Sequence, residues 1–289
     1  MKKLAAFVLA CVLFAAAPAF ARTGVLLVAF GTSMDEARPA IDAIERDYKA
    51  AHDTVLLAFT SDIIRKKLVK EGKPVLSVNA AMNKMAGDGV TELRIQSLHI
   101  APAEEYAQLE RMAVKNIVKH PNRFESVKVG YPLLVSCADL DAVTDAVLAD
   151  LPKDRQPGDA VLLMGHGNDR GPGDLIMAAA AAAFRAKDPN VWLATVEGAN
   201  GFDRVLPQIK ASGAKRVWLQ PFMIVAGDHA RNDLAGPEED SWASRIKAAG
   251  MAPIPHLKGL GEIRAVRDLF RSHTENAVVD LANTKKSDD

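Results

Sequence analysis

Two histidines in the chain stand close to glycine residues and follow strongly apolar runs. His166 lies between two glycines after the run 161–164, and His229 lies two residues beyond a glycine, after the run 217–225. A strand that ends in glycine and then presents histidine places an imidazole at the carboxyl edge of a sheet, where open α/β folds bind their ligands. Because neutral imidazole is the commonest metal-binding side chain, two such histidines facing one pocket predict a divalent-metal site.

A carboxylate can complete this set of ligands. Glu197 follows a third apolar run, 191–196, and two histidines with one carboxylate form a familiar divalent-metal set that leaves a position open for water or substrate. Each residue also has a plainer interpretation, in which His166 is hydrogen-bonded in a turn and the other two lie at helix termini. The matching positions of the two histidines after strands favour the metal site.

Strand-like and helical runs alternate along the chain, which predicts an α/β fold with a mainly parallel sheet. Strands are expected at 24–30, 54–59, 91–100, 126–131, 159–164, 191–196 and 216–225. Helices are expected at 36–51, 75–85, 104–119, 140–151, 175–186, 241–249 and 262–283.

The second half of this pattern repeats the first, although any two strand–helix units look alike to some extent. The spacing from residue 30 to 58 recurs from 166 to 194, and the spacing from 96 to 105 recurs from 220 to 229. In this register the matched pairs are Phe30 with His166, Ser61 with Glu197, and Glu105 with His229. We therefore expect two similar Rossmann-like lobes, 22–135 and 136–289, with a cleft between them. The second lobe would carry the metal ligands.

The first residues predict a cleavable signal peptide, 1–21. Two lysines precede the apolar segment 4–17, and Ala19 and Ala21 form an A-x-A cleavage signal that predicts a mature chain starting at Arg22. An apolar segment of this length is too short to cross a bilayer comfortably. Since no other segment has transmembrane character, we expect a periplasmic protein without a membrane span.

Composition narrows the classes of partner. The chain has 36 basic and 36 acidic residues, and no basic stripe with interleaved aromatic residues, which argues against a nucleic-acid partner. Cys137 is the single cysteine beyond the predicted cleavage site, so the mature chain cannot form an intrachain disulfide. Its stability must come from core burial or from oligomerisation.

Several motifs along the chain resemble one enzyme family, the anaerobic, ATP-independent cobalt chelatases of cobalamin biosynthesis, which are related to ferrochelatase. The most specific motif is the Gly-Asp-His-Ala-x-Asn-Asp run at 227–233. The others are Phe-Gly-Thr-Ser at 30–33, Phe-Thr-Ser at 59–61, Gln-Ser-Leu-His-Ile at 96–100, Glu-Tyr at 105–106, Met-Gly-His-Gly at 164–167 and Leu-Gly-Glu at 260–262. The resemblance spans nearly the whole mature chain.

The resemblance implies a tetrapyrrole, sirohydrochlorin, between the two lobes and insertion of Co²⁺ without ATP. The sequence is consistent with a reaction that uses no ATP, because it has no Gly-x4-Gly-Lys-Ser/Thr motif for binding a nucleotide. His166 and His229 would bind the metal, Glu197 would complete the set, and Glu105 would act as acid or base. The implied substrate-binding residues are Gly31, Thr32, Ser33 and Ser61, which would receive ring carboxylates at a helix N-terminus, and His99, which would line the cleft or be buried and hydrogen-bonded.

The export signal leaves the physiological task open, because cobalamin synthesis is cytoplasmic. One alternative is insertion of Fe²⁺, and another is a non-catalytic periplasmic carrier of metal, tetrapyrrole or haem that delivers its cargo to a transporter. A homo-oligomer is a further expectation. In such an oligomer, one histidine from each of two chains, His52 or His120, could bind a haem. A nucleotide-binding fingerprint at 165–171 misses its last spacing, and a phosphatase would need an arginine before His166.

Overall fold

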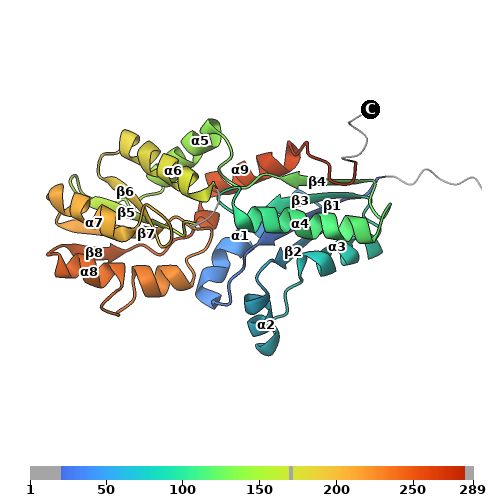
Figure 1. Ribbon diagram of the computed structural model, residues 1–289, viewed down its shortest axis with the longest axis horizontal. Helices are drawn as coiled ribbons and strands as arrows, with labels where there is room; N and C mark the ends of the chain where they lie inside the picture. The colour runs from blue at the N-terminus through green and yellow to red at the C-terminus, as the bar shows by residue number, and fades with distance from the viewer. Residues whose placement is uncertain (1–20, 169–171, 284–289) are drawn as a thin grey trace, which may run out of the picture.

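Two four-stranded parallel sheets form the framework of the molecule, which we describe from a computed structural model covering residues 21–168 and 172–283. The predicted signal peptide, apart from its last residue, lies outside these residues. The first sheet has the strand order β2-β1-β3-β4 and the second has the order β6-β5-β7-β8. Figure 1 shows the two sheets side by side along the long axis. Identical strand orders confirm the α/β prediction of two similar lobes.

The strands of the first sheet are β1 (Thr23–Ala29), β2 (Val55–Phe59), β3 (Glu92–Ser97) and β4 (Ser126–Gly130), and those of the second are β5 (Ala160–Gly165), β6 (Val191–Thr195), β7 (Arg216–Pro221) and β8 (Ala252–Pro255). The longer helices are α1 (Arg38–Lys49), α2 (Asp62–Lys70), α3 (Val78–Gly87), α4 (Glu104–Lys119), α5 (Cys137–Ala149), α6 (Gly173–Lys187), α7 (Phe202–Ala211), α8 (Trp242–Ala248) and α9 (Arg264–Glu275). Short 3-10 turns lie at Asp35–Ala37 and Leu260–Glu262, and a π-helical turn lies at Ala230–Leu234. Within the described residues no helix is long and apolar enough to span a bilayer.

The lobes exchange a helix with each other. Helix α5 follows the last strand of the first sheet but packs on α6 of the second lobe, whereas α9 follows the last strand of the second sheet but packs on β3, β4 and α1 of the first. The two exchanged helices also contact each other. There His273 of α9 lies 3.1 Å from the carboxylate of Asp139 of α5. Each lobe therefore completes its helical cover with a segment from the other half of the chain.

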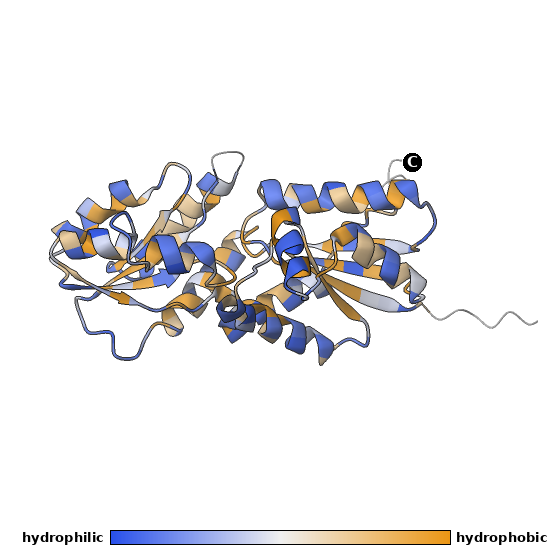
Figure 2. Ribbon diagram, turned by 90° about the horizontal axis from the view of Figure 1, so that it is seen from below, coloured by the Kyte–Doolittle hydropathy of each residue, from blue (hydrophilic) through white to orange (hydrophobic). Residues whose placement is uncertain are grey.

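One apolar cluster runs through both lobes. It joins Leu27 of β1 and Leu163 of β5 through side chains such as Phe184 of α6, Phe222 and Phe270 of α9, all buried. Two further clusters fill the other face of each sheet, beneath α3 and α4 in the first lobe and beneath α7 and α8 in the second. Figure 2 shows the apolar strands between helices whose outer faces are hydrophilic. The shared cluster joins the two lobes into one apolar core.

Several elements differ from their sequence-based bounds. The strand expected at 216–225 ends at Pro221, and the helix expected at 262–283 ends at Glu275. After α9, Asp280 pairs with Lys128 of β4 in an antiparallel bridge. Strand β8 was not expected, because it contains two prolines and proline suits only an edge strand. Helix α7 was missed as well and contains Pro207.

The second lobe contains a buried carboxylate with a full set of donors. Asp159 accepts hydrogen bonds from Arg216 Nε (3.0 Å), Trp218 Nε1 (3.0 Å) and the backbone N–H of Gln156 (2.9 Å). The Arg216 guanidinium holds the pKa of Asp159 well below its usual value, against the opposing effect of burial. This stabilisation is present above the unfolded-state pKa of about 3.9 and is lost as pH falls through the folded-state pKa.

We predict that Asp159→Asn lowers the free energy of unfolding at pH 7 by about 1–3 kcal/mol, because its donors lose their charged acceptor. The difference between wild type and variant should shrink as pH falls below the unfolded-state pKa of about 3.9, because the carboxylate of the unfolded chain then takes up a proton while the native carboxylate stays ionised. Urea unfolding at a series of pH values measures both effects. A difference that stays constant down to pH 2 would contradict the role given to Asp159.

Candidate metal centre

His166 follows β5 directly, in a turn that only glycine permits at the next position. Gly167 has φ +77°, and a Cβ atom there would lie 1.9 Å from the backbone oxygen of Glu197. The backbone N–H of Glu197 in turn donates to the oxygen of His166 at 2.8 Å. The turns that follow β5 and β6 are therefore locked together. This contact explains the glycine that follows His166 and fixes the backbone from which the imidazole projects.

His229 lies eight residues beyond the end of β7, at the start of the π-helical turn Ala230–Leu234. The strand expected to run to residue 225 therefore ends at Pro221, and a longer loop than expected leads from it to His229. Backbone hydrogen bonds from Leu260 and Gly261 to Met223 and Ile224 hold this loop. The loop nevertheless brings His229 to the end of β5, where His166 lies.

The two imidazoles meet at this edge. The ring centroids of His166 and His229 are 5.0 Å apart and the ring planes form an angle of 79°. Two imidazoles bound through Nε2 to one tetrahedral metal, with bonds of about 2.1 Å, have centroids about 5 Å apart. In both rings Nδ1 is hydrogen-bonded, to the Gly167 oxygen in His166 and to Asp233 in His229. The Nε2 atoms are therefore the candidate metal-binding positions.

The backbone of Glu197 is hydrogen-bonded to His166, but the side chain of Glu197 is exposed to solvent. Among residues 21–168 and 172–283, no three His, Cys, Asp or Glu side chains are grouped closely enough to hold a metal ion. The structure thus brings together two of the three predicted ligands. The Glu197 loop is held by Asp174 of α6, which accepts the backbone N–H of Ala199 at 3.1 Å.

Glu105 approaches from the first lobe. It lies half-buried in the first turn of α4, two residues after Ala103. A Cβ atom on Gly173, at the start of α6, would lie 3.3 Å from the Cβ of Ala103. A second contact between the lobes runs from Arg231 Nη2 to the backbone oxygen of Glu36, at 3.3 Å. The carboxyl edges of the two sheets therefore face each other, with Glu105 on the side opposite the histidines.

The predicted substrate-binding turn after β1 also lies at this seam. Gly31 has φ +113°, and Thr32 Oγ1 lies 3.7 Å from the position that a Cβ atom on Gly227 would occupy. Thr32 is buried, and its hydroxyl accepts the N–H of Met34 at 3.1 Å. The turn is separated from α1 by the 3-10 turn Asp35–Ala37. The α-helix itself therefore does not begin at Gly31, Thr32 or the half-buried Ser33.

Ser61 lies in the loop after β2, where its hydroxyl caps α2 by accepting the N–H of Ile64 at 3.4 Å. His99 follows β3 and is buried, with Nδ1 2.8 Å from the hydroxyl of Ser97. Burial lowers the pKa of His99 to about 4, so the ring is neutral near pH 7. Its Nε2 atom has no hydrogen-bond partner in the described part of the chain.

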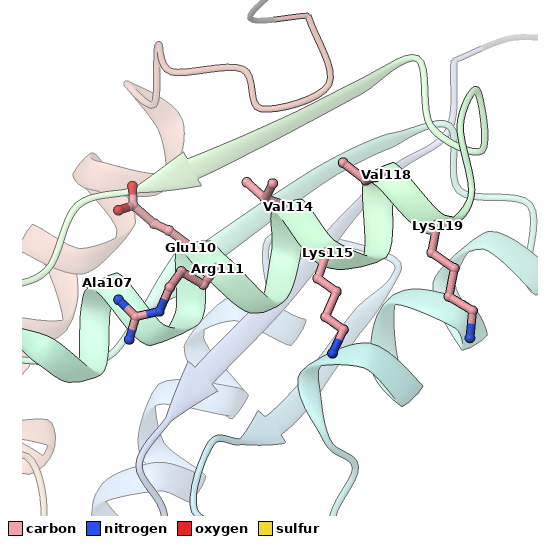
Figure 3. A pocket seen from close by; sticks show the side chains of 7 residues that line it. All are labelled: Ala107, Glu110, Arg111, Val114, Lys115, Val118 and Lys119. Atoms are coloured by element: carbon pink, nitrogen blue, oxygen red, sulfur yellow. The ribbon is translucent and has the colours of Figure 1, made fainter.

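Other candidate positions lie away from the histidine pair. His52 and His120 follow α1 and α4 and precede β2 and β4, which puts them at the amino edge of the first sheet. A shallow groove of about 700 Å³ runs along the outer face of α4, between side chains such as Arg111, Val114 and Val118 (Figure 3). Its lining has no histidine, and Glu110 is its single carboxylate. The groove therefore lacks the ligands for a metal.

Comparison with known proteins identifies the family. The profile of the cobalt chelatase (CbiK) family matches residues 23–279. The chain belongs to this family. It is 36% identical over 259 residues to the sirohydrochlorin cobaltochelatase CbiKC of Nitratidesulfovibrio vulgaris, with 89% of this chain and 91% of that protein covered. It is 34% identical over 268 residues to the sirohydrochlorin cobaltochelatase of Salmonella typhimurium, with 89% and 97% covered.

Solved structures share the fold of this cobalt chelatase at low sequence identity. SirB from Bacillus subtilis with Fe³⁺ has a TM-score of 0.61 at 13% identity, covering 93% of this chain and 99% of that one. The sirohydrochlorin chelatase SirB from Bacillus subtilis subspecies spizizenii, in complex with cobalt, has a TM-score of 0.62 at 13% identity, covering 92% and 98%. The family resemblance, the fold and the enzyme class predicted from the sequence are confirmed.

One residue of the centre was named in a motif without being given a role. Asp233 accepts the Nδ1 proton of His229, with 2.5 Å between the two atoms. The spacing of four residues between His229 and Asp233 could have indicated this contact, because residues four apart lie on the same face of a helical turn. It was missed because no helix was expected at this point of the chain.

We predict that His166→Ala and His229→Ala each weaken Co²⁺ binding by more than about tenfold, since a lost ligand costs at least as much as a lost outer-shell partner. His52→Ala is the matched control, because it removes an imidazole from the opposite edge of the first sheet. Titration of the purified variants with Co²⁺, followed by the absorbance of the bound ion, gives the affinities. Equal binding by all three variants would exclude the histidine pair as the metal site.

Proposed function

We propose that this chelatase inserts Co²⁺ into sirohydrochlorin in the cleft between its lobes, without ATP. The observation that carries the proposal is the pair of imidazoles with centroids 5.0 Å apart at the carboxyl edge of the second sheet. Both curated relatives named above are sirohydrochlorin cobaltochelatases, and each alignment covers about nine-tenths of this chain. The absence of a P-loop motif from the sequence agrees with a reaction that uses no nucleotide.

In this proposal the second lobe presents the metal. His166 and His229 replace water around Co²⁺ as neutral imidazoles, so protons compete with the metal and insertion slows at acid pH. Glu197 supplies the third ligand when its exposed side chain turns toward the pair. Its backbone bond to His166 keeps it within reach. Three exchangeable ligands leave positions at which the nitrogen atoms of the ring can replace water.

The first lobe accepts the protons. Insertion forms four bonds from Co²⁺ to ring nitrogens and releases two pyrrole N–H protons, with no change in the oxidation state of the metal. In the proposal Glu105, in the first turn of α4, takes one proton directly or through water. Because burial keeps His99 neutral near pH 7, it is a poor acceptor for these protons. Gly31, Thr32, Ser33 and Ser61 line the turns that would receive ring carboxylates.

Apolar side chains near the seam suit the faces of a macrocycle. Phe30, directly before Gly31, is 51% exposed, Leu175 in the first turn of α6 is 76% exposed, and Val196, between β6 and Glu197, is 37% exposed. A contiguous group of exposed apolar side chains is characteristic of a ligand-binding surface, and the proposal assigns these three side chains to one such surface. In the proposal they grip the ring in a bent form closer to the transition state than to the flat substrate.

We predict that Glu105→Gln lowers the rate of Co²⁺ insertion by about 10²–10⁴-fold, the usual contribution of a general acid or base, while Co²⁺ binding by the histidines is unchanged. Glu104→Gln is the control, because Glu104 is an exposed neighbour paired with Arg111. The assay follows the absorbance change of sirohydrochlorin with Co²⁺. A spectrum shifted by binding but not converted, in wild type and variant alike, would favour a carrier. Faster conversion with Fe²⁺ would favour iron as the natural metal.

Export to the periplasm is a separate part of the proposal. It rests on the two lysines, the apolar segment 4–17 and the A-x-A signal of the sequence. We predict that the protein recovered from its native cells lies in the periplasmic fraction and begins at Arg22. Cell fractionation followed by N-terminal sequencing tests both points. Recovery of a cytoplasmic chain that begins at Met1 would show that residues 1–21 are retained and the protein is not exported.

A further inference from the structure

The two metal-facing imidazoles are held by acceptors of different charge. His166 Nδ1 lies 3.0 Å from the backbone oxygen of Gly167, whereas His229 Nδ1 lies 2.5 Å from a carboxylate oxygen of Asp233. A carbonyl oxygen and a carboxylate oxygen can only accept, so Nδ1 carries the proton in both rings. Each neutral ring therefore has its lone pair on Nε2, the atom left for the metal.

The π-helical turn places Asp233 for this contact. His229 has helical backbone angles and immediately precedes Ala230–Leu234, so that the residue four positions later lies on the same face. The side chains of His229 and Asp233 are 39% and 46% exposed. Water reaches both side chains, so the bond orients the ring without enclosing it. A second carboxylate on the same turn, Asp228, is held by Asn232 Nδ2 at 2.9 Å.

A charged acceptor changes the ring as a ligand. A carboxylate that accepts the proton of one imidazole nitrogen makes a stronger hydrogen bond than a neutral carbonyl does, and it increases the electron density that the other nitrogen offers to a metal. The two histidines are therefore unequal ligands although their geometry is similar. Nε2 of His229 is expected to bind a divalent ion more strongly than Nε2 of His166.

We propose that Asp233 is a positioning residue that makes His229 the anchoring ligand and leaves His166 as the ligand displaced first. This inference deepens the proposed function and rests on it. Transfer proceeds by ligand exchange, in which each step breaks one bond from Co²⁺ to a water molecule or a protein ligand and forms one to a ring nitrogen. Each pyrrole proton leaves to Glu105 or to water. An unequal pair keeps the ion attached to the protein while the first ring nitrogens bind.

Titration with Co²⁺ alone tests the anchoring role. Asp233→Ala should weaken Co²⁺ binding by about 10–100-fold, the usual effect of removing an outer-shell partner of a metal-bound histidine. The Co²⁺ affinity of Asp233→Asn should lie between those of Asp233→Ala and wild type, because the amide oxygen accepts the same proton without carrying a charge. Asp228→Ala is the matched control, since it removes a carboxylate from the same turn without touching His229. Equal losses for Asp233→Ala and Asp228→Ala would overturn the proposal.

Two further readouts separate positioning from a general loss of structure. In ¹⁵N NMR spectra of the metal-free protein, His229 should carry its proton on Nδ1 in wild type and in Asp228→Ala, and shift toward Nε2 in Asp233→Ala. His229→Ala should lose more Co²⁺ affinity than His166→Ala, and the reverse order would contradict the anchoring role. These measurements need no tetrapyrrole. If they hold while wild type fails to convert sirohydrochlorin, the chelatase function fails and the ligand asymmetry stands.

Discussion

The arrangement of the candidate centre depends on one constraint, that parallel strands bring all their carboxyl ends to the same edge of a sheet. His166, Glu197 and the loop that carries His229 follow three neighbouring strands of the second sheet. Contacts such as that of Arg231 with the Glu36 oxygen set the same edge of the first sheet opposite. A duplicated fold joined in this way has two faces that can differ in chemistry. In the proposed function one face carries the metal ligands, the other carries Glu105, and insertion of the metal uses both.

Hydrophobic patterning predicted much of the fold, because strands buried on both faces have continuous apolar sequences. The repeat was also visible in the spacing, and the strand orders β2-β1-β3-β4 and β6-β5-β7-β8 confirm it. Strand β8 and helix α7 escaped because proline interrupts both, and an edge strand or a helix held by tertiary contacts tolerates it. The exchange of α5 and α9 could not be predicted, since the order of helical runs along the chain does not show on which lobe a helix packs.

The site was predictable in its residue types and less so in its contacts. His166 and His229 came together as expected, because flanking glycines and strand ends identify such positions. The role of Asp233 required knowing that a π-helical turn follows His229. The side-chain position of Glu197 could not be read from the sequence either, because a loop backbone can be fixed while its side chain remains in solvent. Sequence identifies which groups are available, and tertiary contacts decide which of them meet.

The helix exchange also determines when the molecule can fold. The first lobe lacks part of its cover until α9 is present, because Phe270 belongs to the apolar cluster that includes Leu27 of β1. Thr274 of the same helix donates a hydrogen bond to the buried Gln96 of β3 at 2.8 Å. During synthesis from the N-terminus, the first lobe therefore stays incomplete until almost the whole chain has been made. The two lobes of the molecule, although similar in topology, therefore cannot fold one after the other as independent domains do.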